Sequence, residues 1–122
     1  VYKRQAQALE RRLADPDSDV SALLPALRRA LAERAVHPAL HPDAPMTVLS
    51  EGRSDCVILR RSRGGETLVA VHNITAARLS FRLSGLGGDL NQPWADCLSG
   101  HVFEPHQSHS LEPYAVHWLV QP

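Results

Sequence analysis

The stretch "ILRRSRGGETLVAV", residues 58–71, predicts a β-hairpin. Apolar residues stand at both of its ends, and Gly64 and Gly65 lie between them. Glycine readily takes the positive φ that a two-residue hairpin turn requires. Because a lone hairpin is only marginally stable in water, the sequence on either side must supply further strands.

Short apolar segments on both sides of this hairpin supply those strands. Residues that favour turns, mainly glycine, proline and asparagine, separate them. Strands are expected over residues 46–50, 55–61, 67–73, 77–83, 93–98, 101–104, 107–111 and 114–120. Many short strands at such spacing are typical of a β-sandwich or barrel.

The last strand, in "SLEPYAVHWL" (110–119), carries apolar side chains on both faces. Tyr114, Val116 and Trp118 share one face because side chains alternate along a strand. We expect this face to join the core of the sandwich. The opposite face, with His117 and Leu119, is then expected to meet solvent or a neighbouring domain.

The first third of the chain predicts two helices. The turn residues "DPDS" (15–18) end the first one, and the second carries an apolar stripe at helical spacing, formed by Leu23, Leu24, Leu27 and Leu31. Pro25 is best tolerated in a first helical turn, which favours Ser21 over Ser18 as the N-cap. The three prolines of "HPALHPDAP" (37–45) predict an extended connection after this helix.

The sequence therefore predicts an α+β fold. Its parts are a helical segment over residues 1–36, a Pro-rich connection over 37–45, and an all-β antiparallel sandwich over 46–122. About seven or eight short strands are expected in the sandwich.

Composition limits the function classes. The 122 residues include thirteen basic and thirteen acidic ones, so no net charge attracts nucleic acid or an anionic membrane. The apolar runs are too short to span a bilayer and the N-terminus does not resemble a secretory signal, which favours a cytoplasmic location. Cys56 and Cys97 lack the spacing of a metal or redox motif and are expected to be reduced thiols.

A metal site is the strongest alternative that the histidines offer. The segment "HVFEPHQSH" (101–109) contains the candidate ligands His101, Glu104, His106 and His109. His106 does not share strand parity with the other two histidines and a turn intervenes, so surface histidines are the preferred interpretation. In "DPDSD" (15–19) the aspartates have the spacing that starts a calcium loop, but Val20 and Ala26 stand where glycine and glutamate are needed.

The sequence places no serine or cysteine in a nucleophile motif. No pair of carboxylates is flanked by the glycine and aromatic residues that usually build a sugar-cleaving cleft. We therefore predict no catalytic, cofactor-binding or metal-binding residue in this chain, and no cofactor.

Several segments, taken in order, carry a family likeness: "LERRLADPDSD", "LRRALAERAVHPALHPDAP", "TLVAVHNIT", "CLSG" and "LEPYAVHWL". They resemble the C-terminal end of enzymes of the α-amylase superfamily, glycoside hydrolase family 13. The branch they resemble most contains the sucrose phosphorylases and glucosylglycerate phosphorylases. The likeness extends from about Ala8 to Leu119.

The resemblance implies a (β/α)₈ barrel whose three catalytic carboxylates lie outside this stretch. Residues 6–36 would match the last helical stretch of the barrel and residues 46–120 the appended sandwich. The implied function is a non-catalytic C-terminal β-sandwich that supports its own catalytic barrel, which would bind the sugar substrate. Whether the parent enzyme is a phosphorylase or a hydrolase, and which α-glucoside it uses, stays open.

The alternative is a stand-alone carbohydrate-binding module, in which Trp94, Trp118 or Tyr114 would stack on sugar rings. For the helical segment, the leucine stripe predicts that the isolated chain self-associates or frays through this segment, because the partner of the stripe would lie in the barrel.

Overall fold

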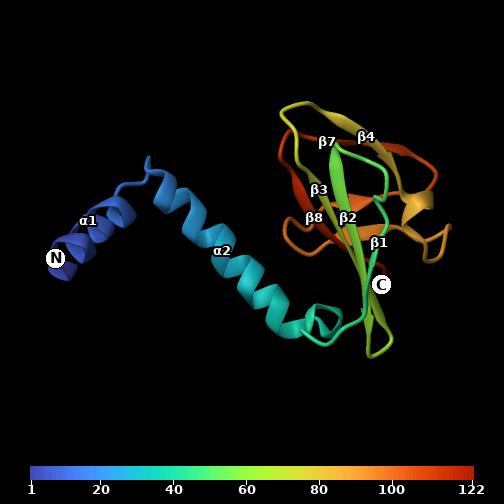
Figure 1. Ribbon diagram of the computed structural model, residues 1–122, viewed down its shortest axis with the longest axis horizontal. Coiled ribbons are helices and arrows are strands. Elements are labelled where there is room, and N and C mark those ends of the chain that lie inside the picture. The colour runs from blue at the N-terminus through green and yellow to red at the C-terminus, as the bar shows by residue number, and fades with distance from the viewer. The chain divides into compact units, whose positions relative to one another are not determined.

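The computed structural model describes all 122 residues, and they form two compact units (Figure 1). The first unit, Val1–Glu33, is helical, and the second, Arg34–Pro122, contains all the strands. Helix α1 spans Tyr2–Ala14 and helix α2 spans Asp19–Val36, so the last turn of α2 belongs to the second unit. Neither helix is long and apolar enough to cross a lipid bilayer.

Side-chain caps determine where α1 ends and α2 begins. The Asp15 carboxylate accepts a hydrogen bond from the backbone N–H of Asp17 (3.0 Å), which closes a turn after α1. Ser18 Oγ accepts one from the N–H of Ser21 (3.1 Å), so Ser18 is the N-cap of α2. The prediction of Ser21 as the cap was wrong, because Ser21 Oγ donates instead to the carbonyl oxygen of Leu13 (3.0 Å).

Pro25 consequently lies inside α2 and not in its first turn. Its ring cannot donate the hydrogen bond that would reach the carbonyl four residues earlier, at Ser21. The helix nevertheless continues to Val36.

The apolar stripe of α2 is exposed in this chain. Leu23, Leu27 and Leu31 expose 66%, 50% and 54% of their surface, and neither helix contains a buried residue. Leu24, the fourth member of the predicted stripe, is half-buried. The stripe therefore has the spacing of a buried helix face, although most of its leucines are exposed.

The second unit confirms the α+β fold with eight antiparallel strands in two sheets. The larger sheet has the order β1-β2-β3-β8-β5-β6 and the smaller one pairs β4 with β7 (Figure 1). The strands are β1 Met46–Val48, β2 Cys56–Arg63, β3 Glu66–Asn73, β4 Leu79–Arg82, β5 Trp94–Asp96, β6 Val102–Phe103, β7 Ser108–Leu111 and β8 Val116–Val120.

The hairpin of β2 and β3 is confirmed in detail. Arg63 pairs with Glu66, which leaves a two-residue turn, and Gly64 and Gly65 take φ values of 61° and 78°. Both positive values fit the turn type that joins tightly paired strands. β3 then pairs with β8 on its other side, which places the hairpin in the centre of the sheet.

Apolar side chains pack on both faces of the larger sheet. The inner cluster lies between the two sheets and is built from Cys56, Ile58, Val69, Val71, Phe81, Leu83, Leu86, Trp94, Phe103, Leu111 and Leu119. The outer cluster, on the opposite face, is built from Ala39, Leu68 and Ala70, with Leu40, Leu59, Cys97, Trp118 and Val120 packed against it. This second cluster corrects two expectations from the sequence.

The first correction concerns the Pro-rich segment. It contains a short 3₁₀ helix, η1 (Pro38–Leu40), whose Ala39 is fully buried in the outer cluster. Pro38 occupies the first turn of η1, where its missing N–H has no partner to lose. The Glu66 carboxylate of β3 holds η1 in place by accepting hydrogen bonds from His37 Nδ1 (2.9 Å) and the Ala39 N–H (3.2 Å).

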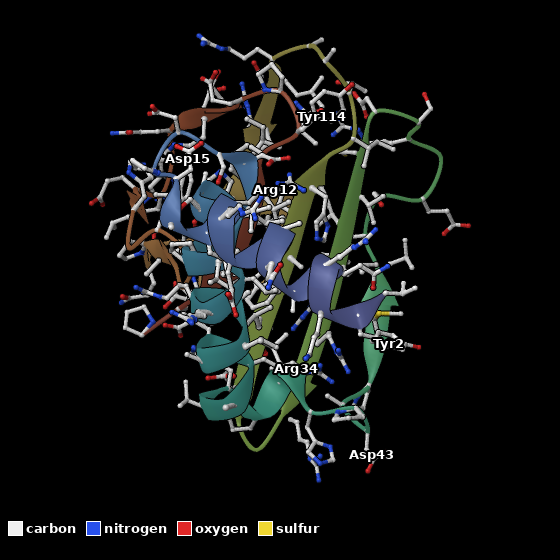
Figure 2. All side chains as sticks on the ribbon, turned by 90° about the vertical axis from the view of Figure 1, so that its left-hand side faces the viewer. Tyr2, Arg12, Asp15, Arg34, Asp43 and Tyr114 are labelled. Atoms are coloured by element: carbon white, nitrogen blue, oxygen red, sulfur yellow. The ribbon has the colours of Figure 1, made fainter.

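The second correction concerns the faces of β8. Leu119 is fully buried in the inner cluster, whereas Trp118 is half-buried in the outer one. Tyr114 is 66% exposed in the turn before the strand, with φ 57°, and so has no strand parity (Figure 2). Strand alternation was correct, but with apolar groups on both faces it could not tell which face was the inner one.

Candidate functional site

A buried carboxylate in the last residue of β5 organises the most polar part of the inner layer. Asp96 exposes 2% of its surface. Its Oδ2 accepts hydrogen bonds from Ser99 Oγ (2.7 Å) and His117 Nδ1 (2.8 Å). Its Oδ1 accepts from the backbone N–H groups of Trp118 (2.9 Å) and Leu98 (3.1 Å). All four contacts favour the ionised carboxylate.

These contacts determine the charge of Asp96. Burial by itself raises the pKa of the carboxyl, but the hydrogen bonds from His117, Ser99 and the two backbone groups outweigh it and lower the pKa to about 2. Asp96 is therefore an anion with every strong acceptor position occupied. Such a group joins β5 to β8 and is not free to act as a nucleophile or a proton acceptor.

The histidines of the predicted metal alternative lie apart. His109 Nε2 donates to the carbonyl oxygen of Glu104 (2.9 Å), and the His106 ring lies beside Asn91 Oδ1 (3.2 Å). His101 and His109 instead contact the ring of Phe103, with centroids 4.5 and 5.1 Å away. The nitrogen atoms of His106 and His109 are thus held by different partners, and the four residues do not form a group whose possible ligand atoms lie together.

Asn73, at the end of β3, is a second buried polar residue that the sequence analysis missed. Its Nδ2 donates to the carbonyl oxygens of Ala77 (2.7 Å) and Glu112 (3.0 Å), and its Oδ1 accepts from the N–H of Thr75 (3.0 Å). Asn73 thereby joins the β3–β4 turn to the segment before β8. The motif "NIT" gives a turn signal, but the contact with Glu112 arises only in the folded chain.

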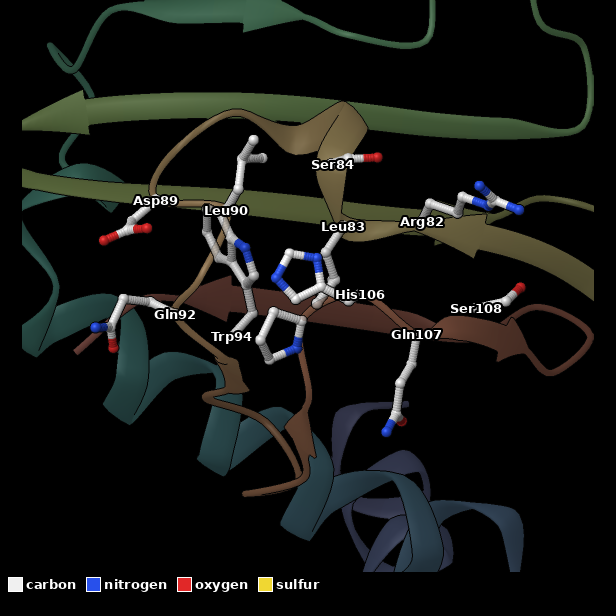
Figure 3. A pocket seen from close by; sticks show the side chains of 11 residues that line it. Arg82, Leu83, Ser84, Asp89, Leu90, Gln92, Trp94, His106, Gln107 and Ser108 are labelled. Atoms are coloured by element: carbon white, nitrogen blue, oxygen red, sulfur yellow. The ribbon is translucent and has the colours of Figure 1, made fainter.

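The second unit also contains a pocket of about 320 Å³ (Figure 3). It lies where β4, the loop before β5 and the loop before β7 meet. The lining residues are Arg82, Leu83, Ser84, Asp89, Leu90, Gln92, Trp94, Pro105, His106, Gln107 and Ser108. Its volume is at the lower end of the range usual for small-ligand sites.

The loop on one side of this pocket is fixed by Gln121. Gln121 Oε1 accepts a hydrogen bond from the N–H of Asp89 (2.9 Å), and Gln121 Nε2 donates to the carbonyl oxygens of Asp89 (2.7 Å) and Gln92 (3.2 Å). The loop on the other side has His106 at φ 64°, which is uncommon for a residue other than glycine. Both sides of the pocket therefore have defined conformations.

The three aromatic residues of the carbohydrate-module alternative do not form one platform. Trp94 is 2% exposed in the inner cluster, Trp118 belongs to the outer cluster, and Tyr114 lies in the turn before β8. Sugar stacking requires exposed ring faces, and the Trp94 ring lies within the packed core.

The two cysteines lie on opposite faces of the larger sheet. Cys56 is buried in the inner cluster and Cys97 is half-buried in the outer one, and they are not bonded to each other. Burial raises the pKa of the Cys56 thiol, which keeps it protonated and slow to react. That both thiols stay reduced in solution remains a prediction.

Comparison with known proteins gives one related sequence and several related folds. No protein-family model matches the chain. Glucosylglycerate phosphorylase from Allomeiothermus silvanus is 36% identical over 119 residues, which cover 98% of this chain and 19% of the phosphorylase. The resemblance to the C-terminal part of α-amylase-superfamily enzymes is confirmed.

Two solved structures have the same fold as this chain. The trehalulose synthase MutB from Pseudomonas mesoacidophila superimposes with a TM-score of 0.69 at 22% identity, over 93% of this chain and 19% of the synthase. An Anoxybacillus α-amylase superimposes with a TM-score of 0.68 at 16% identity, over 88% of this chain and 24% of the amylase. At these identities the structures establish the fold alone.

The extent of these matches is informative in two ways. The chain spans about a fifth of the length of the phosphorylase that it matches. Arg34–Pro122 makes up about three quarters of the chain, so a match over 93% of it also includes most of the helical unit. The two helices are thus part of what this chain shares with the synthase.

Proposed function

We propose that this chain is a non-catalytic part of an enzyme that acts on α-glucosides, in the branch of the sucrose and glucosylglycerate phosphorylases. The observation that carries the proposal is the 36% identity to a glucosylglycerate phosphorylase over 98% of this chain, combined with the small share of the phosphorylase that it spans. The parent enzyme would transfer or hydrolyse a glucosyl group on a catalytic barrel, in the cytoplasm, without help from residues of this chain.

The state of the buried carboxylates supports a non-catalytic role. Asp96 is fully occupied by hydrogen bonds, and Glu66 is engaged with His37 and Ala39. A retaining glycosidase needs two carboxyl groups that both reach the glycosidic bond. Neither of these groups has the freedom for that task.

The exposed leucines of α2 support a docking role. Leu23, Leu27 and Leu31 repeat every four residues and are at least half-exposed. We infer that this face packs against the catalytic barrel, as the last helices of a barrel would. The β unit then completes the C-terminal side of the enzyme.

The docking role can be tested in the enzyme that joins this chain to its barrel. Leu31→Glu should lower the melting temperature of the whole enzyme and its glucosyl-transfer activity, because a charge would enter the packed face. Ala32→Glu, at the exposed neighbouring position, is the matched control and should change neither. Equal behaviour of the two variants would contradict docking through this face.

The non-catalytic role has its own test. The purified chain should not phosphorolyse or hydrolyse sucrose, maltose or glucosylglycerate. Turnover by highly purified chain that disappears when one of its carboxylates is substituted would overturn the proposal.

A further inference from the structure

The floor of the pocket contains a buried donor without a partner. Trp94 is 98% buried, yet its indole Nε1 makes no hydrogen bond within the protein. The only fully enclosed side-chain nitrogen or oxygen without a partner is Arg61 Nε, so Trp94 Nε1 must reach open space. Trp94 lines the pocket, and Figure 3 shows its indole nitrogen on the side of the ring that faces His106.

A buried indole N–H normally finds an acceptor, because leaving it unpaired is costly. No protein group supplies one here, although the neighbouring loops are held in place by Gln121 and Asn91. The acceptor must therefore be water or a ligand oxygen that enters the pocket. The Trp94 N–H gives the pocket a defined polar contact at its floor.

His106 provides the complementary group. Its Nε2 lies 3.2 Å from Asn91 Oδ1, an acceptor, which favours the tautomer with the proton on Nε2 and with Nδ1 as an acceptor. Both rings line the pocket, so a donor on Trp94 and an acceptor on His106 border the same space. A ligand with hydroxyl groups can satisfy both, since a hydroxyl accepts from a donor such as Trp94 Nε1 and donates to an acceptor such as His106 Nδ1.

The remaining lining favours a neutral ligand with several hydroxyl groups. The charges of Arg82 and Asp89 cancel, and the hydroxyls of Ser84 and Ser108 add groups that both donate and accept. Leu90 and Pro105 offer apolar surface, which suits the C–H face of a sugar ring. A free anion would leave the apolar part of this lining without contacts, and a long apolar ligand would leave its polar groups without hydrogen bonds.

We propose that the pocket lined by Trp94 and His106 binds one ring of a neutral sugar, whose hydroxyl groups accept from Trp94 Nε1 and donate to His106 Nδ1. The ring would contact the edge of Trp94 and not stack on its face. The site goes beyond the supporting role proposed above and does not depend on it, because every residue involved belongs to the β unit.

The proposal is tested by nuclear magnetic resonance on the ¹⁵N-labelled chain titrated with glucose and with sucrose. The indole N–H signal of Trp94 should shift and saturate with millimolar affinity, while that of Trp118, on the outer face, should not move. Trp94→Phe assigns the signal. The same titration with inorganic phosphate should leave it in place.

A second variant tests the proposal without changing a buried core residue. His106→Asn retains a residue type that tolerates positive φ but removes the ring, and it should weaken sugar binding at least about tenfold. His101→Asn, an exposed histidine outside the pocket, is the control and should bind normally.

Three outcomes would overturn the proposal. They are no shift of the Trp94 signal with either sugar, a shift with phosphate instead, or equal shifts of Trp94 and Trp118. Loss of sugar binding in the His101 control would do the same. None of these results depends on whether the chain supports a catalytic barrel.

Discussion

The helical unit and the β unit place similar residues in opposite environments. Leu27 and Leu31 of α2 are at least half-exposed, whereas Leu68 and Leu119 of the β unit are fully buried. Both sets follow the period of their element, 3.6 residues in the helix and 2 in the strands. The β unit has two apolar clusters of its own, and the helices contain no buried residue.

This difference predicts that the helical unit is less stable than the β unit in the isolated chain. Isolated helices of 13 and 18 residues are marginal in water, because most helix stability in proteins comes from tertiary packing. The β unit, in contrast, should unfold cooperatively. Trp94 and Trp118 both lie in the β unit, so tryptophan fluorescence reports its unfolding, while far-ultraviolet circular dichroism is dominated by the helices.

The largest effect is expected from Asp96→Ala. The substitution leaves His117, Ser99 and two partly buried backbone N–H groups without their acceptor. The loss of its acceptor costs a buried donor about 1–3 kcal/mol, so the loss of several such contacts should cost about 3–5 kcal/mol in total. Urea unfolding followed by tryptophan fluorescence should show this loss, with little change in the helical signal.

The control for this prediction is Asp89→Ala, an exposed aspartate of the same unit. Its cost should stay below about 1 kcal/mol. Similar losses of unfolding free energy in the two variants would mean that the hydrogen bonds of Asp96 contribute no more to stability than an exposed aspartate does.

The next effect concerns η1, which lies near the start of the β unit and covers its outer cluster. A chain that starts at Asp43 lacks η1 and uncovers Leu68 and Ala70, whereas one that starts at Arg34 keeps them covered. Re-exposure of a buried leucine costs about 2 kcal/mol, so the shorter chain should be less stable by that amount. Equal urea midpoints for the two chains would show that η1 is only a connection.

The pH dependence of the β unit should follow Asp96. Its pKa is about 2 in the folded chain and 3.8 for the unperturbed group, so ionisation stabilises the fold above the unfolded pKa. The contribution, about 2 kcal/mol, is lost as pH falls from about 4 to about 2. Urea midpoints across this range should fall in the wild type, and the Asp96→Ala variant should lack this part of the dependence.

The sequence predicted the secondary-structure elements better than it predicted the buried polar residues and the pocket. All eight strands and the Gly64–Gly65 turn were found, because turn residues and strand alternation are local signals. The inner face of β8 was misjudged because η1 buries the other face too. The start of α2 was misplaced because the tolerance of the helix for Pro25 was underestimated.

Asp96 and the pocket were missed for a different reason. In "WADCLSG" the aspartate looks like a turn residue, and only Ser99 three positions on is a local sign of its hydrogen bonds. His117 lies 21 residues away and meets Asp96 only when β8 pairs with β5. The pocket likewise joins three separate segments of the chain. Such contacts depend on topology, which strand patterns alone do not specify.

The smallest effect on stability, and the most direct test of the contrast between the units, is expected from Leu27→Glu. Leu27 is 50% exposed, so its substitution should leave the unfolding free energy of the β unit unchanged. The stripe it belongs to should nevertheless drive self-association of the isolated chain, since leucines aligned on one helix face form an apolar patch. Sedimentation velocity should find the wild type associated and Leu27→Glu monomeric, with Arg28→Glu, which introduces the same carboxylate one position away, still associated. A monomeric wild-type chain would mean that the stripe does not bind a copy of itself, and the docking experiment with Leu31→Glu would then be the only remaining test of this face.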